Sequence, residues 1–273
     1  MHSQASSVAS AAVPLREYDV VLNESYRLSA ATGLDQGDRE RQEDQLALLA
    51  HPRVNDCMMG VVADGMGGRT GGRMGSAQAV MIARRLFEGY RPGVDDPMAL
   101  LRRIGLQAHM MIRQTGIATE EEPHSTIAVF VITPDGACHW MHSGDSRIYH
   151  FHGDTLVKRT RDHSYVQMLV DSGELTEAEA AAHPQSNVLM SCLGTEREPD
   201  FDVHSIPCLQ PGDTLLACSD GLWRYFDADE LGMVVSALPP SDASQILVRQ
   251  ARHRAMGEAD NLSLIIVRLD PLQ

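Results

Sequence analysis

The chain has 273 residues and a formal net charge of −14, and 43% of its residues are hydrophobic. This length and composition fit a globular domain with a substantial core and exclude a largely disordered or coiled-coil chain. The acidic excess disfavours nucleic acid and anionic membrane surfaces as partners. No apolar run approaches the roughly 20 residues that cross a bilayer, and the first residues lack the pattern of a secretory signal.

The five cysteines are far apart and none has CxxC spacing. This usage favours a reducing compartment, so we expect a cytoplasmic protein in which all five are small buried residues. Residues 1–27 are predicted to form a partly flexible N-terminal tail. Because no internal repeat or long linker follows, residues 28–273 are predicted to form a single domain.

Short apolar runs predict strands, and helical spacing predicts two long helices after the first of them. The strands are expected at residues 57–63, 127–132, 138–142, 147–151, 214–219 and 262–269. The first helix carries an apolar face at Ala79, Ile82, Ala83, Leu86 and Tyr90. The second is expected to begin at Asp96-Pro97 and to stop near Gly116.

A small helical flap is predicted at about residues 162–195, between strands. Gly173 is expected to close its first helix, and Thr176 with Glu179 forms a capping box for the next. Two later helices are expected at residues 229–238 and 241–256. This order of elements predicts an α+β fold with mainly antiparallel sheets.

Three aspartates stand at the ends of runs that are predicted to be buried strands. Asp64 and Asp220 directly follow such runs, and Asp260 shortly precedes one. Turn capping would explain any one of them, but three carboxylates without a basic sequence neighbour are costly to bury. Ligation by oxygen alone is typical of Mg²⁺ and Mn²⁺, so the three aspartates predict a divalent-cation site.

Six short motifs occur in order along most of the chain. They are Arg39-x-x-x-Glu43-Asp44, Ala63-Asp64-Gly65-Met66-Gly67-Gly68, Ser143-Gly144-Asp145-Ser146-Arg147, Asp162-His163-Ser164, Ser219-Asp220-Gly221 and Asp260-Asn261. Each motif alone is weak evidence. In this order, over about residues 29–269, they resemble the motifs of the metal-dependent protein phosphatases (PPM, the type 2C serine/threonine phosphatases) of the bacterial branch.

The resemblance implies a four-layer α-β-β-α sandwich of two mainly antiparallel sheets, flanked by helices and carrying a small helical flap. It also implies hydrolysis of phosphoserine and phosphothreonine in proteins by a water molecule that bridges two Mn²⁺ or Mg²⁺ ions. By this resemblance Asp64 would bridge the ions and Gly65 would offer its carbonyl oxygen to one of them. Asp220 and Asp260 would complete the coordination of the other ion, and Arg39 would hold the substrate phosphate.

Further roles and partners are implied in the same way. Glu43 and Asp44 would act through metal-bound water, and Asp145 with Asp220 would form a third, weaker metal site. The partners would be phosphorylated proteins, including a serine/threonine kinase and its substrates, and we expect a monomer that binds no nucleic acid.

The histidines give little further guidance. Met66 stands where many eukaryotic members have a histidine, which leaves His163 as the nearest motif histidine to a departing hydroxyl. The twelve histidines show no zinc-site spacing such as HExxH, and His139 and His142 are interpreted as structural.

Two other functions remain open. A catalytically inactive relative could bind phosphoproteins without hydrolysing them, but the complete set of Asp64, Asp220 and Asp260 argues against it. A metal-dependent hydrolase of small phosphate esters is the other alternative, and the flap, as a docking surface for proteins, argues against that.

Overall fold

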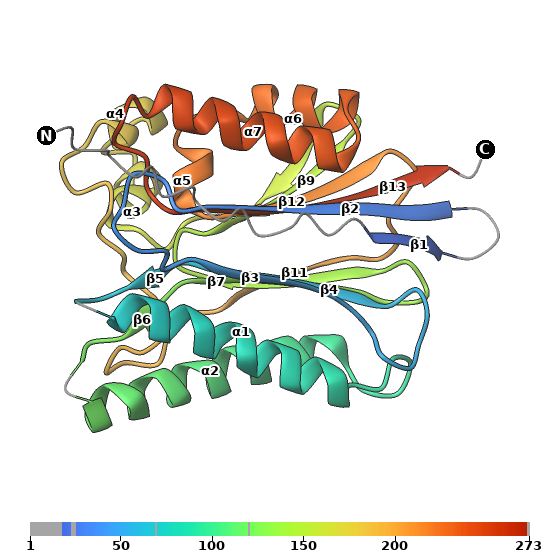
Figure 1. The fold of residues 1–273 in the computed structure, drawn as a ribbon, viewed down its shortest axis with the longest axis horizontal. Coiled ribbons are helices and arrows are strands. Elements are labelled where there is room, and N and C mark those ends of the chain that lie inside the picture. Colours follow the sequence, from blue (N-terminus) through green and yellow to red (C-terminus); the bar gives the residue numbers. More distant parts are fainter. Residues whose placement is uncertain (1–17, 23–25, 69, 120, 272–273) are drawn as a thin grey trace, which may run out of the picture.

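Two antiparallel sheets pack face to face and carry helices on both outer faces, as predicted (Figure 1). The computed structural model describes residues 18–22, 26–68, 70–119 and 121–271. The first sheet runs in the order β1 (Tyr18–Leu22), β2 (Tyr26–Asp35), β13 (Leu262–Pro271), β12 (Asp213–Cys218), β9 (Arg147–His152) and β10 (Thr155–Arg159).

The second sheet lies directly beneath the first in Figure 1. Its order is β11 (Asp202–Ile206), β8 (Cys138–Ser143), β7 (Ile127–Ile132), β4 (Met58–Ala63) and β3 (Gln45–Ala50). A two-stranded ribbon of β5 (Gly65–Met66) and β6 (His124–Ser125) extends one end of this layer. The six predicted strands are all present, with ends shifted by at most two residues.

Helices cover the outer face of each sheet (Figure 1). The second sheet is covered by α1 (Gly71–Gly89) and α2 (Pro97–Thr119), and the first by α6 (Ala228–Ala237) and α7 (Pro240–Arg254). The expected stop of α2 at Gly116 is wrong, because the helix continues to Thr119. Gly116 instead makes room for a neighbouring loop, since a Cβ there would lie 3.2 Å from Cδ of Pro123.

The flap contains two short helices, α3 (Tyr165–Asp171) and α4 (Glu177–Ala181). Gly173 follows α3 with a positive φ of 78°, and the Thr176–Glu179 capping box opens α4 as predicted. The flap lies at the same end of the sandwich as β5, β6 and the short helix α5 (Asp220–Trp223), which the sequence did not predict (Figure 1).

Three further expectations concern the N-terminal tail, the burial of the cysteines and the absence of a membrane span. Residues 1–17 and 23–25 of the predicted tail lie outside the described residues. Four cysteines are buried, but Cys208 is exposed, so the expectation that all five are buried is wrong. Among the described residues no helix has the length and apolar character needed to span a membrane.

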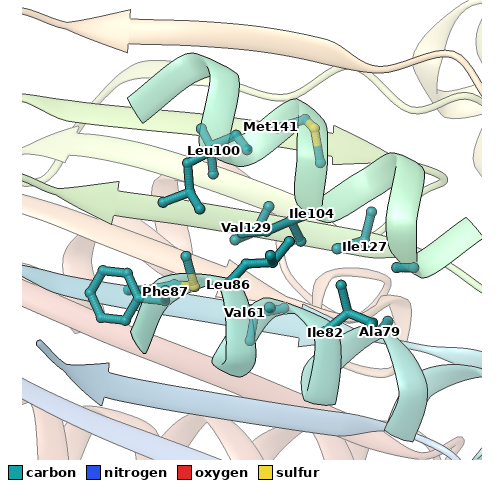
Figure 2. Close-up of a cluster of buried hydrophobic side chains, with 14 of the residues drawn as sticks. Val61, Ala79, Ile82, Leu86, Phe87, Leu100, Ile104, Ile127, Val129 and Met141 are labelled. Atoms are coloured by element: carbon teal, nitrogen blue, oxygen red, sulfur yellow. The ribbon is translucent and has the colours of Figure 1, made fainter. Parts of the chain in front are cut away.

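The central strands are buried on both faces, which explains why they are apolar without alternation. Val61 of β4 packs with Ile82 and Leu86 of α1 and Ile104 of α2 beneath the second sheet (Figure 2). The neighbouring Val62 points into the layer between the two sheets. The packed layers hold the strand ends, which carry the motif residues, in fixed positions.

Gly60 of β4 gives a test of this packing. It lies opposite Phe130 of β7, and a Cβ at Gly60 would lie 2.3 Å from Cζ of that buried ring. Gly60→Ala should therefore lower the free energy of unfolding by about 1–3 kcal/mol through overpacking. Urea denaturation measures the change.

Gly89→Ala is the matched control. Gly89 is the last residue of α1, and a Cβ there would meet nothing within 4 Å. Alanine is favoured over glycine in a helix, so this variant should be as stable as the parent or more so. Equal destabilisation by both substitutions would contradict the packing argument.

Candidate active site

An acidic cavity of about 660 Å³ lies at the flap end of the sandwich. Most of the predicted site residues meet there, namely Arg39, Glu43, Asp64, Gly65, Asp145, Asp220 and Asp260. Asn187 and Leu189 of the flap also line the cavity. The fold thus brings together residues as far apart in the sequence as Arg39 and Asp260, which are separated by 221 positions.

The aspartates reach the cavity because they lie at strand ends on the same side of the sandwich. Asp64 follows β4, Asp145 lies in the turn from β8 to β9, and Asp220 opens α5, with one residue between it and the end of β12. Asp260 precedes β13, which pairs with β12. The hydrogen-bonded strands fix the spacing of the carboxylates before any ligand binds.

Close backbone packing holds Asp64 in place. Its N–H donates to Oγ1 of Thr126 at 3.0 Å, and its carbonyl oxygen accepts from the Thr126 N–H at 2.9 Å. The next residue must be glycine, because a Cβ at Gly65 would lie 2.1 Å from the carbonyl oxygen of Gly72 in α1. The Asp-Gly segment can therefore lie directly against the start of the helix.

Asp44 lies outside the set of residues that line the cavity and is fully buried. Ser219 and Ser263 donate hydrogen bonds to its Oδ2 at 2.6 and 2.8 Å, whereas its Oδ1 is buried without a partner. Burial raises the pKa of Asp44 to about 7, against the opposing effect of the two serine hydroxyls.

The cavity aspartates are also held as weaker acids than usual. Burial raises the pKa of Asp64 well above its ordinary value, and the charges of Asp44, Asp220 and Asp145 raise it further. Burial followed by the charge of Asp220 raises the pKa of Asp145 to about 8. These shifts show that the carboxylates repel one another within the cavity.

Two arginines offset part of this repulsion. Arg39 contacts Oδ2 of Asp260 at 2.6 Å, and Arg224 contacts Oδ2 of Asp220 at 2.8 Å. The three strand-end aspartates have no basic neighbour in the sequence, but the fold gives two of them an arginine partner. Arg224 was missed because it is four residues from Asp220, directly after a helix too short to be predicted from its sequence.

A second network fixes the turn that carries Asp145. Arg147 binds both carboxylate oxygens of Asp162 at 2.8 and 2.7 Å, and its guanidinium carbon lies 3.5 Å from the centre of the Trp223 ring. Nε1 of Trp223 donates to the carbonyl oxygen of Asp145 at 2.9 Å. These contacts connect Asp162, at the start of the flap, to Asp145, which lines the cavity.

The donor set fits a hard divalent cation. Six acidic residues and Gly65 line the cavity, and its three arginines do not balance the negative charge. Oδ1 of Asp44 has no partner, and the pKa of Asp64 is raised. Both are expected where carboxylates lie close together without enough positive charge to neutralise them. Oxygen donors of this kind suit Mg²⁺ and Mn²⁺.

The described residues place no histidine on the cavity wall. Met66 lines the cavity, as its motif position predicts. Nε2 of His163 instead lies 3.4 Å from Oδ2 of Asp202, on β11. His163 is therefore poorly placed to donate a proton to a group in the cavity.

The chain is similar to known bacterial proteins. The family model for protein phosphatase 2C matches residues 38–241. The chain is 32% identical over 218 residues to the protein phosphatase PhpP of Streptococcus pneumoniae, covering 77% of this chain and 85% of that protein.

Solved structures agree with this similarity. The Mycobacterium tuberculosis serine/threonine phosphatase PstP/Ppp has a TM-score of 0.76 and 26% identity, covering 89% of this chain and 99% of that one. PppA of Pseudomonas aeruginosa, a regulatory component of its T6SS, has a TM-score of 0.73 and 30% identity, covering 89% and 97%.

The raised pKa values predict how pH affects the protein in a chelator. The unfolded chain releases protons near the ordinary value of 3.8, whereas folded Asp44 and Asp145 hold theirs to about 7 and about 8. The folded state binds more protons over this interval, so the chelated protein should lose stability as pH rises through it. Thermal unfolding in EDTA at stepped pH values measures the trend.

Asp145→Asn should flatten this trend because it removes one of the carboxylates. At the alkaline end of the interval, the Tm of this variant should exceed that of the parent. The difference should be about 2–4 °C for each kcal/mol gained in the free energy of unfolding. Asp154→Asn, in the exposed turn between β9 and β10, is the control and should follow the parent. A stability that rises with pH over this interval would contradict the prediction.

Proposed function

The chain belongs to the protein phosphatase 2C family, and we propose that it hydrolyses phosphoserine and phosphothreonine in proteins with two bound divalent cations. The observation that carries this proposal is the convergence of Asp64, Asp220 and Asp260 from separate strand ends on one cavity. Phosphatases of this family use Mn²⁺ or Mg²⁺, and the oxygen donors of the cavity suit both ions.

We assign the central ions to the residues on the cavity floor. Asp64 and the carbonyl of Gly65 would hold one ion, and Asp64, Asp220 and Asp260 would hold the other. Two divalent cations held together supply positive charge to phosphoryl oxygens and lower the pKa of water. The Asp220 side chain is only 13% exposed, and such partial removal from water strengthens electrostatic interactions.

Asp44 and Glu43 make hydrogen bonds to residues next to the proposed ion ligands. Asp44 accepts hydrogen bonds from Ser219, which precedes Asp220, and from Ser263 on β13. The backbone N–H of Glu43 donates to Oδ1 of Asn261, next to Asp260, at 2.7 Å. We propose that both acidic residues orient water and ligands at the central ions, without direct ligation by Asp44.

A third, weaker cation site is proposed at Asp145 and Asp220. Both residues line the cavity, and the charge of Asp220 raises the pKa of Asp145. The link from Asp145 through Trp223 to Arg147 connects this site to the flap.

Arg39 is proposed to bind the substrate phosphate. Its side chain is 62% exposed and its ion pair with Asp260 is at the rim, where an ion pair contributes little to stability. A phosphate dianion could therefore replace Asp260 as its partner. The planar guanidinium offers two parallel hydrogen bonds to phosphate oxygens.

We further propose that the substrates are phosphoproteins, among them a serine/threonine kinase and its targets, and that the chain acts as a monomer in the cytoplasm. All five cysteines are free, which supports a reducing compartment. The flap residues Asn187 and Leu189 form part of the cavity wall, so a protein substrate would contact the flap as its phosphorylated side chain enters.

Release of phosphate from a phosphothreonine peptide tests the function. EDTA should abolish turnover and Mn²⁺ should restore it. Asp64→Asn should lower kcat by about 100-fold or more, because it removes charge that holds the cations, while Asp154→Asn should retain full activity. Steady-state kinetics with and without Mn²⁺ measures both.

The same assay separates the alternatives. Peptide binding without hydrolysis in saturating Mn²⁺ would indicate an inactive phosphoprotein-binding relative. Hydrolysis of a small aryl phosphate with no activity on the peptide would indicate a small-ester hydrolase. Full activity of protein dialysed against chelator would refute the use of divalent cations.

Substitution of Arg39 tests its role as phosphate ligand. Arg39→Ala should lower kcat/KM by about 10- to 100-fold, the value of a hydrogen bond to a charged group. Arg39→Lys should recover only part of this loss, because an ammonium cannot make the two-point contact. Arg85→Ala, on the exposed face of α1, is the control.

Calorimetric titration with Mn²⁺ separates phosphate binding from metal binding. Arg39→Ala should leave Mn²⁺ affinity undiminished, because the substitution removes positive charge from the rim. The role is refuted if Mn²⁺ affinity falls as far as kcat/KM does.

A further inference from the structure

A second group of metal-binding side chains lies outside the acidic cavity. It consists of His142, His163 and Asp202, each of which offers one ligand atom within 4.8 Å of the others. None of the three lines the cavity. His142 is on β8, Asp202 lies directly opposite it on β11, and His163 is at the start of the flap.

His142 is oriented as a metal ligand would be. Its Nε2 lies 2.8 Å from the carbonyl oxygen of Arg161, which can only accept, so Nε2 carries the proton. The other nitrogen, Nδ1, therefore presents a lone pair. This atom is buried in a residue only 2% exposed and has no hydrogen-bond partner.

This pattern is common among histidines that bind metals. A ligating histidine usually donates its second N–H to a backbone carbonyl or carboxylate, which fixes the ring and its tautomer. A second proton, on Nδ1, would be buried without an acceptor. The surroundings of the ring therefore favour the neutral form that metals require.

His163 and Asp202 complete the group, whose ligand atoms lie within 4.8 Å of one another. The His163 ring stacks on the His142 ring with centroids 4.6 Å apart. Nε2 of His163 lies 3.4 Å from Oδ2 of Asp202, which is long for a hydrogen bond. Nδ1 of His163 accepts an equally long hydrogen bond, 3.4 Å, from the N–H of Gly144, so ligation through Nε2 would move the ring proton to Nδ1 and replace this weak contact. The distance from Nε2 to Oδ2 also has a meaning for metal binding. It is close to the roughly 3.3 Å that separates two ligands of a tetrahedral zinc ion with bonds of about 2.0–2.1 Å.

We propose that His142 Nδ1, His163 Nε2 and the Asp202 carboxylate bind a Zn²⁺ ion, separate from the catalytic cations. Two imidazoles and one carboxylate favour Zn²⁺ over Mg²⁺, which prefers oxygen ligands. The Asp202 side chain is 63% exposed, so the fourth position faces solvent. The ion can therefore enter and leave from the surface.

The ion would join three segments that are distant in sequence. The backbone N–H of His163 donates to the carbonyl of Gly144 at 2.9 Å, and its carbonyl accepts from the N–H of Met190 at 2.7 Å. Zinc bound at His163 would thus connect both ends of the flap and the Gly144-Asp145 turn to strands β8 and β11.

Zinc uptake by the whole chain tests the proposal. Equilibrium dialysis in saturating Mg²⁺, which occupies the oxygen sites, should show one tightly held Zn²⁺ per chain. His163→Gln and Asp202→Asn should each weaken this binding by about tenfold or more. Asp202 is largely exposed, so its substitution should leave the fold intact.

His204→Gln is the matched control, because it removes another imidazole from β11, two residues beyond Asp202. It should leave zinc affinity unchanged. The proposal is overturned if the parent takes up no zinc in Mg²⁺, if zinc binding survives both His163→Gln and Asp202→Asn, or if His204→Gln weakens it equally.

Cobalt gives a second readout that distinguishes this site from the acidic cavity. Co²⁺ in a four-coordinate site with nitrogen ligands absorbs visible light far more strongly than Co²⁺ held by six oxygens. The strong bands should appear in the parent and in Asp64→Asn, and should be lost in His163→Gln. Bands that vanish in Asp64→Asn but persist in His163→Gln would place the ion in the cavity and refute the proposal.

Discussion

The mutual repulsion of carboxylates at one end of the sandwich is the constraint on which the rest of the structure depends. Asp64, Asp145 and Asp220 would move apart or take up protons if they were free to do so. They stay together because each lies at the end of a hydrogen-bonded strand, anchored by cores on both sides. Stability gained by apolar packing far from the cavity therefore supports an arrangement that is unfavourable within it.

The surroundings of the carboxylates divide into fixed and exchangeable contacts. Ser219, Ser263 and Thr126 are buried and make short hydrogen bonds within the floor. Arg39 and Arg224 lie nearer the rim, and their ion pairs are partly solvated. This division suits a site that must keep its cation-binding geometry while its anionic ligands come and go.

The sequence was most informative where burial leaves a simple pattern. Strands β4, β7 and β12 are buried on both faces and mostly apolar. Asp64 and Asp220 could be identified because each is a charged residue at the end of such a run. By contrast, β10 and β11 are half-exposed edge strands with mixed residues, and Arg224 depends on a four-residue helix. His142, His163 and Asp202 come together only through the pairing of β8 with β11 and the path of the flap, which residue spacing does not encode.

The strand order of the first sheet has a consequence for synthesis on the ribosome. The last strand, β13, lies between β2 and β12, so it joins the N-terminal part of the sheet to the rest. Until residues 262–271 emerge, β2 and β12 have no partner between them and expose unpaired backbone edges, which are prone to aggregate. A nascent chain arrested before β13 would therefore carry nearly all of the motif residues yet be a substrate for chaperones or proteases.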